Sequence, residues 1–336
     1  MTTAGLLLLA AASASSPVSF SLHPWHASVH FPTAGRFAAA LPVVLLVTGF
    51  GGEIPAEAYS DLSTAVASRG AVMIGLSRPP PFPMLTDYPA VARSLDPVLQ
   101  FVVNGSLAAR LSEAGAPAPP NVSALILGGH SAGCHVAVRR ILSSGCGAVG
   151  GVLLLDPVDG ADPWGLRKEF VISPPNPLRF STPALHLETG LDPRPVQPLE
   201  PACAPRRLSN GRFFDAWGGP IWQANATAFG HMDLANDGGA GAAASFVCPG
   251  NKDRRERRGY RHFLATAIAA FARGLVVDGS MAAAAAAVNG SASAGIDVLF
   301  ASRRAGRPQE VRPGCELSSR LTLPPVAQPR RAESQI

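Results

Sequence analysis

Short, continuously apolar runs alternate with helix-like segments along most of this sequence, and that alternation constrains the fold more than any other feature. Strands that are apolar at every position are buried on both faces, which is typical of a parallel sheet covered by helices. The predicted strands are PVVLLV (42–47), AVMIGL (71–76), VSALIL (122–127), AVGGVLLL (148–155), ALHLET (184–189) and PIWQANAT (220–227). The predicted helices cover about 56–69, 88–113, a segment from 133, and 260–275. We therefore expect one doubly wound α/β domain.

The two ends of the chain depart from this pattern. Residues 1–22 combine a short apolar run with small residues and no acids, which resembles a signal peptide without a basic start and is also compatible with a plastid transit peptide. Residues 279–336 are rich in Ala and then in Pro and Arg, a low-complexity composition that predicts a disordered tail. The sequence thus predicts a targeting segment, an α/β domain over 23–278 and a tail.

Composition and charge exclude several classes of protein. The chain has 28 Lys and Arg against 23 Asp and Glu, but only 15% of its residues are charged, and the basic ones gather at 252–261 and in the tail. Nucleic-acid binding is disfavoured, because no basic stripe is interleaved with aromatic residues. The arginines indicate a solvated face that can contact anionic lipid at a membrane surface. No apolar run approaches the roughly 18 residues that span a bilayer.

Cysteine and histidine spacing predicts no metal centre. Five cysteines without a CxxC pair allow one disulfide bridge but not a zinc site or a disulfide framework. His23, His26 and His30 have a spacing that suits a metal, yet no acidic or cysteine ligand accompanies them. We expect neither a metal nor a cofactor in this protein.

The segment Gly129-His130-Ser131-Ala132-Gly133 matches the G-x-S-x-G pattern between a buried strand and a helix. In that context the serine occupies a sharp turn where flanking side chains do not fit, and its hydroxyl is exposed at a helix N-terminus. Backbone N–H groups and the helix dipole there favour developing negative charge. We predict that Ser131 is a nucleophile.

A serine hydroxyl needs a base, and His231 stands where the base of this arrangement falls, after the last predicted central strand and before the last helix. A loop histidine that bonds a carbonyl group is the structural alternative. His130 is a variable position of the turn, and His135 projects from the following helix. His186 lies within a strand and is predicted to be a core or sheet-face residue.

Two acids compete to orient the imidazole of His231. Asp156 directly ends the strand after the nucleophile, and Asp192 follows the next strand. Both would emerge at the carboxyl edge of the sheet, and position alone leaves them nearly level. Asp159 and Asp162 lie deeper in a loop and are less constrained.

The loop after the first central strand, LLVTGFGG, is expected to supply the second donor to an oxyanion. Gly49 permits the backbone turn, and the amides of Phe50 and Ala132 would together form the oxyanion hole. The alternative is that these glycines are only turn residues. Two loops rich in Pro and Gly, 77–89 and 159–183, follow strand ends at the same edge, where a substrate mouth is expected.

Several segments, in order from about residue 30 to 275, make the chain resemble the chlorophyllase family of α/β-hydrolases. They are LPVVLLVTGF, LILGGHSAG, LLLDPVDG, PALHLETGL, EPACAP and FGHMDLAND, followed by Cys248 and an Arg-rich run. The resemblance implies an α/β-hydrolase fold, with a mostly parallel sheet and helices on both faces. It also implies a triad of Ser131, Asp156 and His231, because the family's segment has no acid where Asp192 stands.

The resemblance further implies hydrolysis of the phytyl ester of chlorophyll through an acyl-enzyme, with the magnesium belonging to the substrate, and a location in the chloroplast. The secretory pathway or vacuole is the alternative location. The chain departs from the family at Ala132 and Cys134, where GHSRGG is usual, and at Thr48, where a histidine is usual. These changes border the site and concern the substrate more than the ester chemistry. Other functions that fit are a lipase or phospholipid acetylhydrolase-like esterase, and a non-catalytic pigment- or lipid-binding protein.

Overall fold

The apolar runs form the parallel centre of a sheet. The computed structural model describes residues 17–35, 40–79, 87–160, 169–176, 178, 181–196, 201–239, 248–278, 280, 286 and 296–303. Within them the strands lie in the order β1-β2-β4-β3-β5-β6-β7-β8-β9. Their bounds are β1 Val18–Leu22, β2 Trp25–His30, β3 Leu41–Val47, β4 Val72–Ser77, β5 Pro120–His130, β6 Val149–Leu155, β7 Ala184–Thr189, β8 Ile221–Ala226 and β9 Val298–Arg303. Neighbouring strands from β4 to β8 pair in parallel, whereas β1, β2 and β9 pair antiparallel at the two edges.

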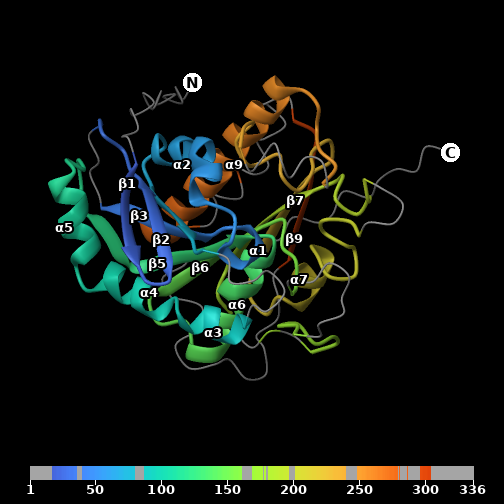
Figure 1. Ribbon diagram of the computed structural model, residues 1–336, viewed down its shortest axis with the longest axis horizontal. Helices are drawn as coiled ribbons and strands as arrows, with labels where there is room; N and C mark the ends of the chain where they lie inside the picture. The colour runs from blue at the N-terminus through green and yellow to red at the C-terminus, as the bar shows by residue number, and fades with distance from the viewer. Residues whose placement is uncertain are drawn as a thin grey trace, which may run out of the picture.

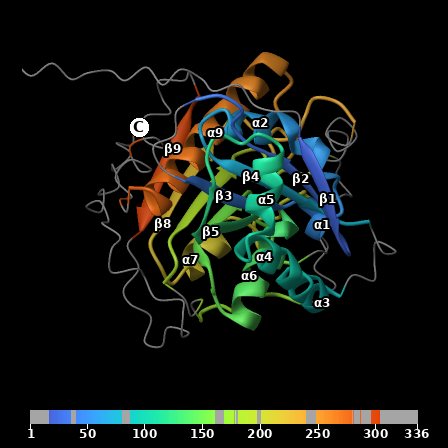
Figure 2. The ribbon, with the colours of Figure 1, turned by 90° about the vertical axis from the view of Figure 1, so that its left-hand side faces the viewer.

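Helices cover both faces of this sheet, which is why every residue of β3 and β4 is buried. One face packs against α3 Tyr88–Arg93, α4 Asp96–Val103, α5 Ser106–Glu113, α6 Ala132–Ser144 and α7 Gly211–Ala216. The other face packs against α2 Ser60–Ala67 and α9 Arg254–Val276 (Figures 1 and 2). This is the α/β-hydrolase arrangement expected from the sequence. No described helix is long and apolar enough to cross a membrane.

Two predicted helices differ in extent from the structure. The segment 88–113 forms three helices, α3, α4 and α5, because Pro97 lacks a backbone donor and Gly105 adopts a φ of 92°. The last helix begins at Arg254, six residues before the predicted start. Its N-cap is Asp253, whose carboxylate accepts from two backbone N–H groups of the first turn. The first turn of this helix is charged, so the apolar periodicity did not indicate where the helix begins.

Parts of both chain ends expected to lie outside the domain belong to the sheet. Val18–Leu22, inside the expected targeting segment, forms β1 and pairs with β2. Val298–Arg303, inside the expected tail, forms β9 and pairs with β8. Residues 1–16 and 304–336 lie outside the described residues, as do 80–86 and 161–168 of the loops expected to form the mouth.

Candidate active site

Ser131 lies at the turn between β5 and α6. Its backbone has φ 56° and ψ −130°, a region that a side-chain-bearing residue rarely adopts and that costs on the order of 1–3 kcal/mol. Its N–H donates to the carbonyl of Leu155 at 3.0 Å, and its carbonyl accepts from Val158 at 3.2 Å. The β6 strand end therefore holds the strained turn in place. The Ser131 side chain stays half-buried at the carboxyl edge of the sheet.

The glycines flanking Ser131 leave no room for a side chain. A Cβ built on Gly129 would lie 2.1 Å from the backbone carbon of Gly133. One built on Gly133 would lie 2.2 Å from the carbonyl oxygen of Val47, at the end of β3. Distances this short would force the strands and helix apart. The spacing of the motif therefore has the steric cause inferred from the sequence.

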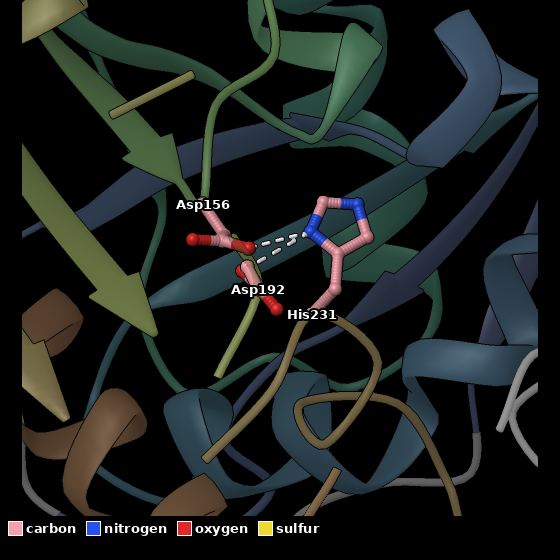
Figure 3. A group of neighbouring side chains, drawn as sticks. All are labelled: Asp156, Asp192 and His231. Carbon is pink, nitrogen blue, oxygen red and sulfur yellow. Dashed lines mark hydrogen bonds and ion pairs between the residues drawn. The ribbon is translucent and has the colours of Figure 1, made fainter. Parts of the chain in front are cut away.

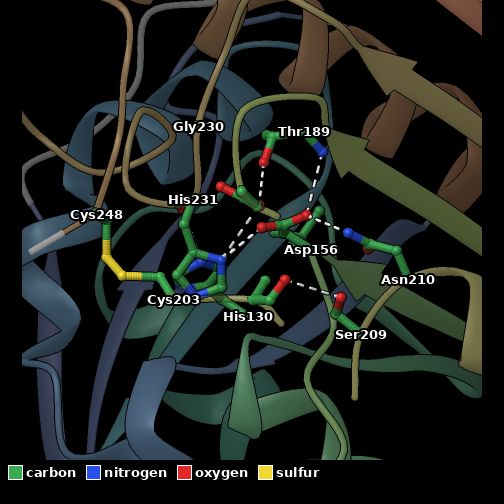
Figure 4. Close-up of polar contacts among 12 residues, drawn as sticks. His130, Asp156, Thr189, Cys203, Ser209, Asn210, Gly230, His231 and Cys248 are labelled. Atoms are coloured by element: carbon green, nitrogen blue, oxygen red, sulfur yellow. Dashed lines mark hydrogen bonds and ion pairs between the residues drawn. A yellow bond between two sulfur atoms is a disulfide. The ribbon is translucent and has the colours of Figure 1, made fainter. Parts of the chain in front are cut away.

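Asp156 follows β6 directly, and every part of its carboxylate has a partner. Oδ1 accepts from the backbone N–H of Thr189 at 3.1 Å and from Nδ2 of Asn210 at 2.9 Å (Figure 4). Oδ2 lies 2.5 Å from Nδ1 of His231. Burial by itself raises the pKa of Asp156, but the hydrogen bonds from His231 and Asn210 outweigh it and hold the pKa below its ordinary value. Asp156 is thus an ionised acceptor for the imidazole.

His231 lies in the turns between β8 and α9 and is almost fully buried. Because Nδ1 donates to Asp156, the other ring nitrogen, Nε2, is free to take a proton. The ring of His130, the residue before Ser131, lies 4.5 Å from the ring of His231 between centroids. The Ser131 hydroxyl makes no hydrogen bond with a described residue; such bonds often form only when substrate binds. The structure thus joins Asp156 to His231 and holds both beside the turn that carries Ser131.

Asp156 and Asp192, between which position along the chain did not decide, both approach Nδ1 of His231 (Figure 3). Oδ2 of Asp192 lies 3.5 Å from Nδ1 of His231, against 2.5 Å for Asp156. Only the shorter of these distances is that of a hydrogen bond. Asp156 is therefore the acid that holds the ring, and Asp192 lies just beyond it.

Asp156, Asp192 and His231 also carry ligand atoms within 4.8 Å of one another, so a metal must be considered. Ligands of one tetrahedral zinc ion are about 3.3 Å apart, given bonds of about 2.0–2.1 Å. The 2.5 Å between Nδ1 and the Asp156 oxygen is too short for two ligands of one ion and fits a hydrogen bond instead. Two of the three histidines of the N-terminal segment have separate partners: His26 contacts Glu57, and His30 contacts Thr64 and Ser28.

The loop expected to hold the oxyanion forms a short turn, α1 (Gly49–Gly52), directly after β3. Phe50 adopts a φ of 53°, and its side chain is 56% exposed. Within the described part of the chain, the N–H groups of Phe50 and Ala132 donate to no acceptor. Thr48, a departure from the resembling family, is buried and donates to the carbonyl of Ile54, which ties the loop down.

Sequence reasoning missed a buried link between this loop and His231. The N–H of Gly49 donates to the Tyr59 hydroxyl at 3.1 Å, and that hydroxyl lies 2.8 Å from Nδ1 of His130. Nε2 of His130 in turn lies 3.0 Å from the backbone oxygen of His231. His130, which the sequence marked as a variable position, therefore connects both sides of the site. No sequence signal pairs Tyr59 with His130 across 71 residues.

The other candidate groups are structural. Asp159 is buried and bonds Nδ1 of His135 at 3.0 Å and Nε of Arg212 at 2.8 Å, which anchors the loop after Asp156. His186 is buried on the sheet face, as predicted, and Nε2 contacts Asn210 at 3.0 Å. Asp162 lies outside the described residues.

The structure gives the state of four of the five cysteines. Cys203 and Cys248 form a disulfide (Figure 4). Cys146 is also disulfide-bonded, so the chain has a bridge beyond the one that the sequence predicted. Cys134 is a free, fully buried thiol that donates to the carbonyl of Gly129, and burial raises its pKa well above the ordinary value. It packs beneath the turn rather than acting as a reactive group.

Comparison with known proteins places this chain in a family. The family model described as chlorophyllase matches residues 22–298. The chain belongs to the chlorophyllase family. Chlorophyllase-2 of Arabidopsis thaliana is 29% identical over 250 residues, covering 68% of this chain and 72% of that protein. As a chlorophyllase-family protein, the chain is a carboxylic ester hydrolase.

A solved structure agrees with the fold of this chlorophyllase-family chain. A ferulic acid esterase from Streptomyces cinnamoneus matches with a TM-score of 0.50 and 17% identity, covering 75% of this chain and 82% of that chain. At that identity the match supports the fold alone.

Proposed function

We propose that this protein hydrolyses the phytyl ester of chlorophyll through a triad of Ser131, His231 and Asp156. The observation that carries the proposal is the bond between Nδ1 of His231 and Asp156 beside a strained serine turn. Chlorophyllase-2, the Arabidopsis relative, supports the substrate by its name. The exposed ring of Phe50 on the oxyanion loop adds an apolar surface that suits a long hydrocarbon ester.

The first half of the reaction transfers the acyl group to Ser131. Nε2 of His231 removes the hydroxyl proton, and Oγ attacks the ester carbonyl carbon. The carbonyl oxygen becomes an oxyanion, which accepts from the N–H groups of Phe50 and Ala132. Asp156 stabilises the imidazolium by its bond to Nδ1. When the tetrahedral intermediate collapses, His231 returns the proton to the alkoxide oxygen and phytol leaves.

The second half releases the acid. A water molecule gives a proton to Nε2 of His231 and attacks the acyl carbon of the ester to Ser131. The same amides hold the second oxyanion. Collapse breaks the bond to Oγ, which regains its proton from His231, and chlorophyllide leaves. The magnesium of chlorophyll belongs to the substrate and leaves with chlorophyllide.

The experiment compares two esters with the wild type and with Ser131→Ala. We expect the wild type to release phytol from chlorophyll and p-nitrophenol from a short ester, and Ser131→Ala to lose both. Cleavage of the short ester alone would remove chlorophyll as the substrate and leave the esterase. Hydrolysis of a panel of lipid esters would then identify a lipase or phospholipid acetylhydrolase-like enzyme. If the substrate is an ester other than chlorophyll, we expect Ala132, where the family has arginine, to account for the difference in substrate.

A non-catalytic pigment- or lipid-binding protein is the remaining alternative. It would bind chlorophyll or lipid but turn over neither ester, and Ser131→Ala would leave binding and turnover unchanged. The bond between Asp156 and Nδ1 of His231 argues against a non-catalytic protein. It leaves Nε2 as a base beside a strained serine, an arrangement that catalysis needs and a structural histidine does not.

We further propose that the enzyme works at a chloroplast membrane surface, by peripheral contact. The support is the acid-free Ser, Thr and Ala composition at the start of the sequence and the arginine-rich run in the first turns of α9. The full-length chain with a C-terminal fluorescent tag, expressed in an algal cell, tests the location. We expect fluorescence at the plastid; fluorescence in secretory compartments or the vacuole would contradict it.

A further inference from the structure

Asp192 lies next to a triad that is complete without it. Its side chain has no exposed surface, and Oδ2 lies 3.5 Å from Nδ1 of His231. Among the described residues Oδ1 has no hydrogen-bond partner. Burying a carboxylate with an unpaired oxygen costs free energy that an apolar residue would not. Packing alone therefore does not account for an acid at this position.

Thr189, the last residue of β7, holds both acids at once. Its backbone N–H donates to Oδ1 of Asp156 (Figure 4). Its hydroxyl donates to Oδ2 of Asp192. The turn that carries Asp192 is also tied to the loop of His231, because the N–H of Leu191 donates to the carbonyl of Phe229 at 3.0 Å. Asp192 is thus fixed relative to the ring of His231 by two independent connections.

We propose that Asp192 is a second positioning carboxylate for His231, able to hold the Nδ1–H tautomer when Asp156 does not. The inference rests on the proposed function of Ser131, Asp156 and His231. Closing the 3.5 Å separation to hydrogen-bond length needs a movement of less than about 1 Å, which a rotation of the ring provides. The chlorophyllase segment that this chain resembles has no acid at this place, so the second carboxylate distinguishes this chain.

Two substitutions of Asp156 separate this role from simple loss of the acid. In Asp156→Asn, Thr189 and Asn210 still donate to the position of Oδ1, so the amide oxygen occupies it. The amide NH₂ then faces His231 and forces Nδ1 to accept. Nε2 carries the proton in that tautomer and cannot take one from Ser131, so kcat falls by about 10⁴.

In Asp156→Gly no group at 156 opposes the correct tautomer, and glycine tolerates the φ of 44° found there. Asp192 then becomes the only carboxylate at Nδ1. We expect Asp156→Gly to lose only about 10²-fold in kcat, and Asp156→Gly with Asp192→Asn to fall to the level of Asp156→Asn. Asp192→Asn alone should lower kcat by less than about threefold, since Asp156 still holds the ring.

The matched control is Glu188→Gln, which removes a different carboxylate near Asp156 that does not contact His231. It should leave the residual activity of Asp156→Gly unchanged. The same comparison is made with Asp156→Ser, with and without Asp192→Asn. The proposal can then be tested even if Asp156→Gly does not fold. Equal kcat in Asp156→Gly with and without Asp192→Asn, with both proteins folded, would overturn the proposal.

A spectroscopic readout is independent of turnover. With ¹⁵N-labelled histidine, we expect a downfield Nδ1–H signal of His231 in Asp156→Gly that disappears when Asp192→Asn is added. A signal unaffected by Asp192→Asn would contradict the role. If the wild type cleaves no ester, the proposed function fails, and this signal still decides whether Asp192 holds the imidazole.

Discussion

The Nε2 atom of His130 lies 3.0 Å from the backbone carbonyl oxygen of His231. A carbonyl can only accept, so Nε2 of His130 carries a proton and donates. Nδ1 of His130 must then accept from the Tyr59 hydroxyl, whose oxygen accepts from the N–H of Gly49. Burial, with the charge of His231, lowers the pKa of His130 to about 3, so the ring stays neutral and the direction of the bonds is fixed. This chain of bonds sets the distance between the oxyanion loop and His231.

Tyr59→Phe removes the middle of that chain. It leaves the Gly49 N–H and Nδ1 of His130 buried without partners, which should cost about 1–3 kcal/mol of the free energy of unfolding. We also expect kcat on a p-nitrophenyl ester to fall about tenfold with little change in KM, because the misplaced groups act on the transition state. Tyr260→Phe, a buried tyrosine of α9, is the control and should keep kcat. If Tyr59→Phe is destabilised but keeps a normal kcat, the link contributes to stability and not to catalysis.

Glu188 should make stability depend on pH. Burial, and the charge of Asp156, raise the pKa of Glu188 to about 7 from its ordinary value near 4.5. The folded state therefore resists ionisation of this acid, and Glu188 lowers the free energy of unfolding when it is ionised. This loss of stability is absent below about pH 4.5, grows up to about pH 7 and is constant at higher pH. Glu188→Gln mimics the neutral form. We expect it to raise stability by about 1–3 kcal/mol at pH 8 and to leave it unchanged at pH 4, measured by denaturant unfolding at both values.

The disulfide between Cys203 and Cys248 should account for part of the stability of the His231 region. Cys203 and Cys248 are 45 residues apart in sequence, and His231 lies between them. Cross-linking a loop of that length stabilises by up to about 4 kcal/mol through the unfolded state. We predict that Cys203→Ser with Cys248→Ser lowers the thermal midpoint by several degrees, as calorimetry would show. Cys134→Ala, which removes the free thiol, should have a smaller effect, and an equal effect would contradict the assignment.

The central strands were predictable because burial on both faces leaves a continuous apolar run, as in β3 and β4. β1 was not, because it lies at an edge of the sheet, where its residues alternate between half-buried and exposed. Its sequence also resembles a targeting segment. β9 follows a low-complexity stretch, and only its pairing with β8 makes it a strand.

The serine turn was predictable from five consecutive residues, since its cause is local crowding. Position along the chain did not choose between Asp156 and Asp192, because the choice depends on a difference of 1.0 Å at one nitrogen, between 3.5 and 2.5 Å. Only the resemblance to the chlorophyllase family favoured Asp156. The difference in distance is set by the register of β6 and β7 and by Thr189. The Tyr59 and His130 link was invisible for the same reason: its partners meet only through packing between distant segments.

The most direct test of the account is labelling with a fluorophosphonate probe, followed by mass spectrometry of the modified peptide. The probe phosphonylates a serine only when its hydroxyl is activated by a base. We predict stoichiometric labelling of Ser131 in the folded wild-type protein and at least a hundredfold slower labelling in His231→Ala. Labelling of another residue, or none at Ser131 in a protein that is folded, would contradict the claim that Ser131 is the nucleophile.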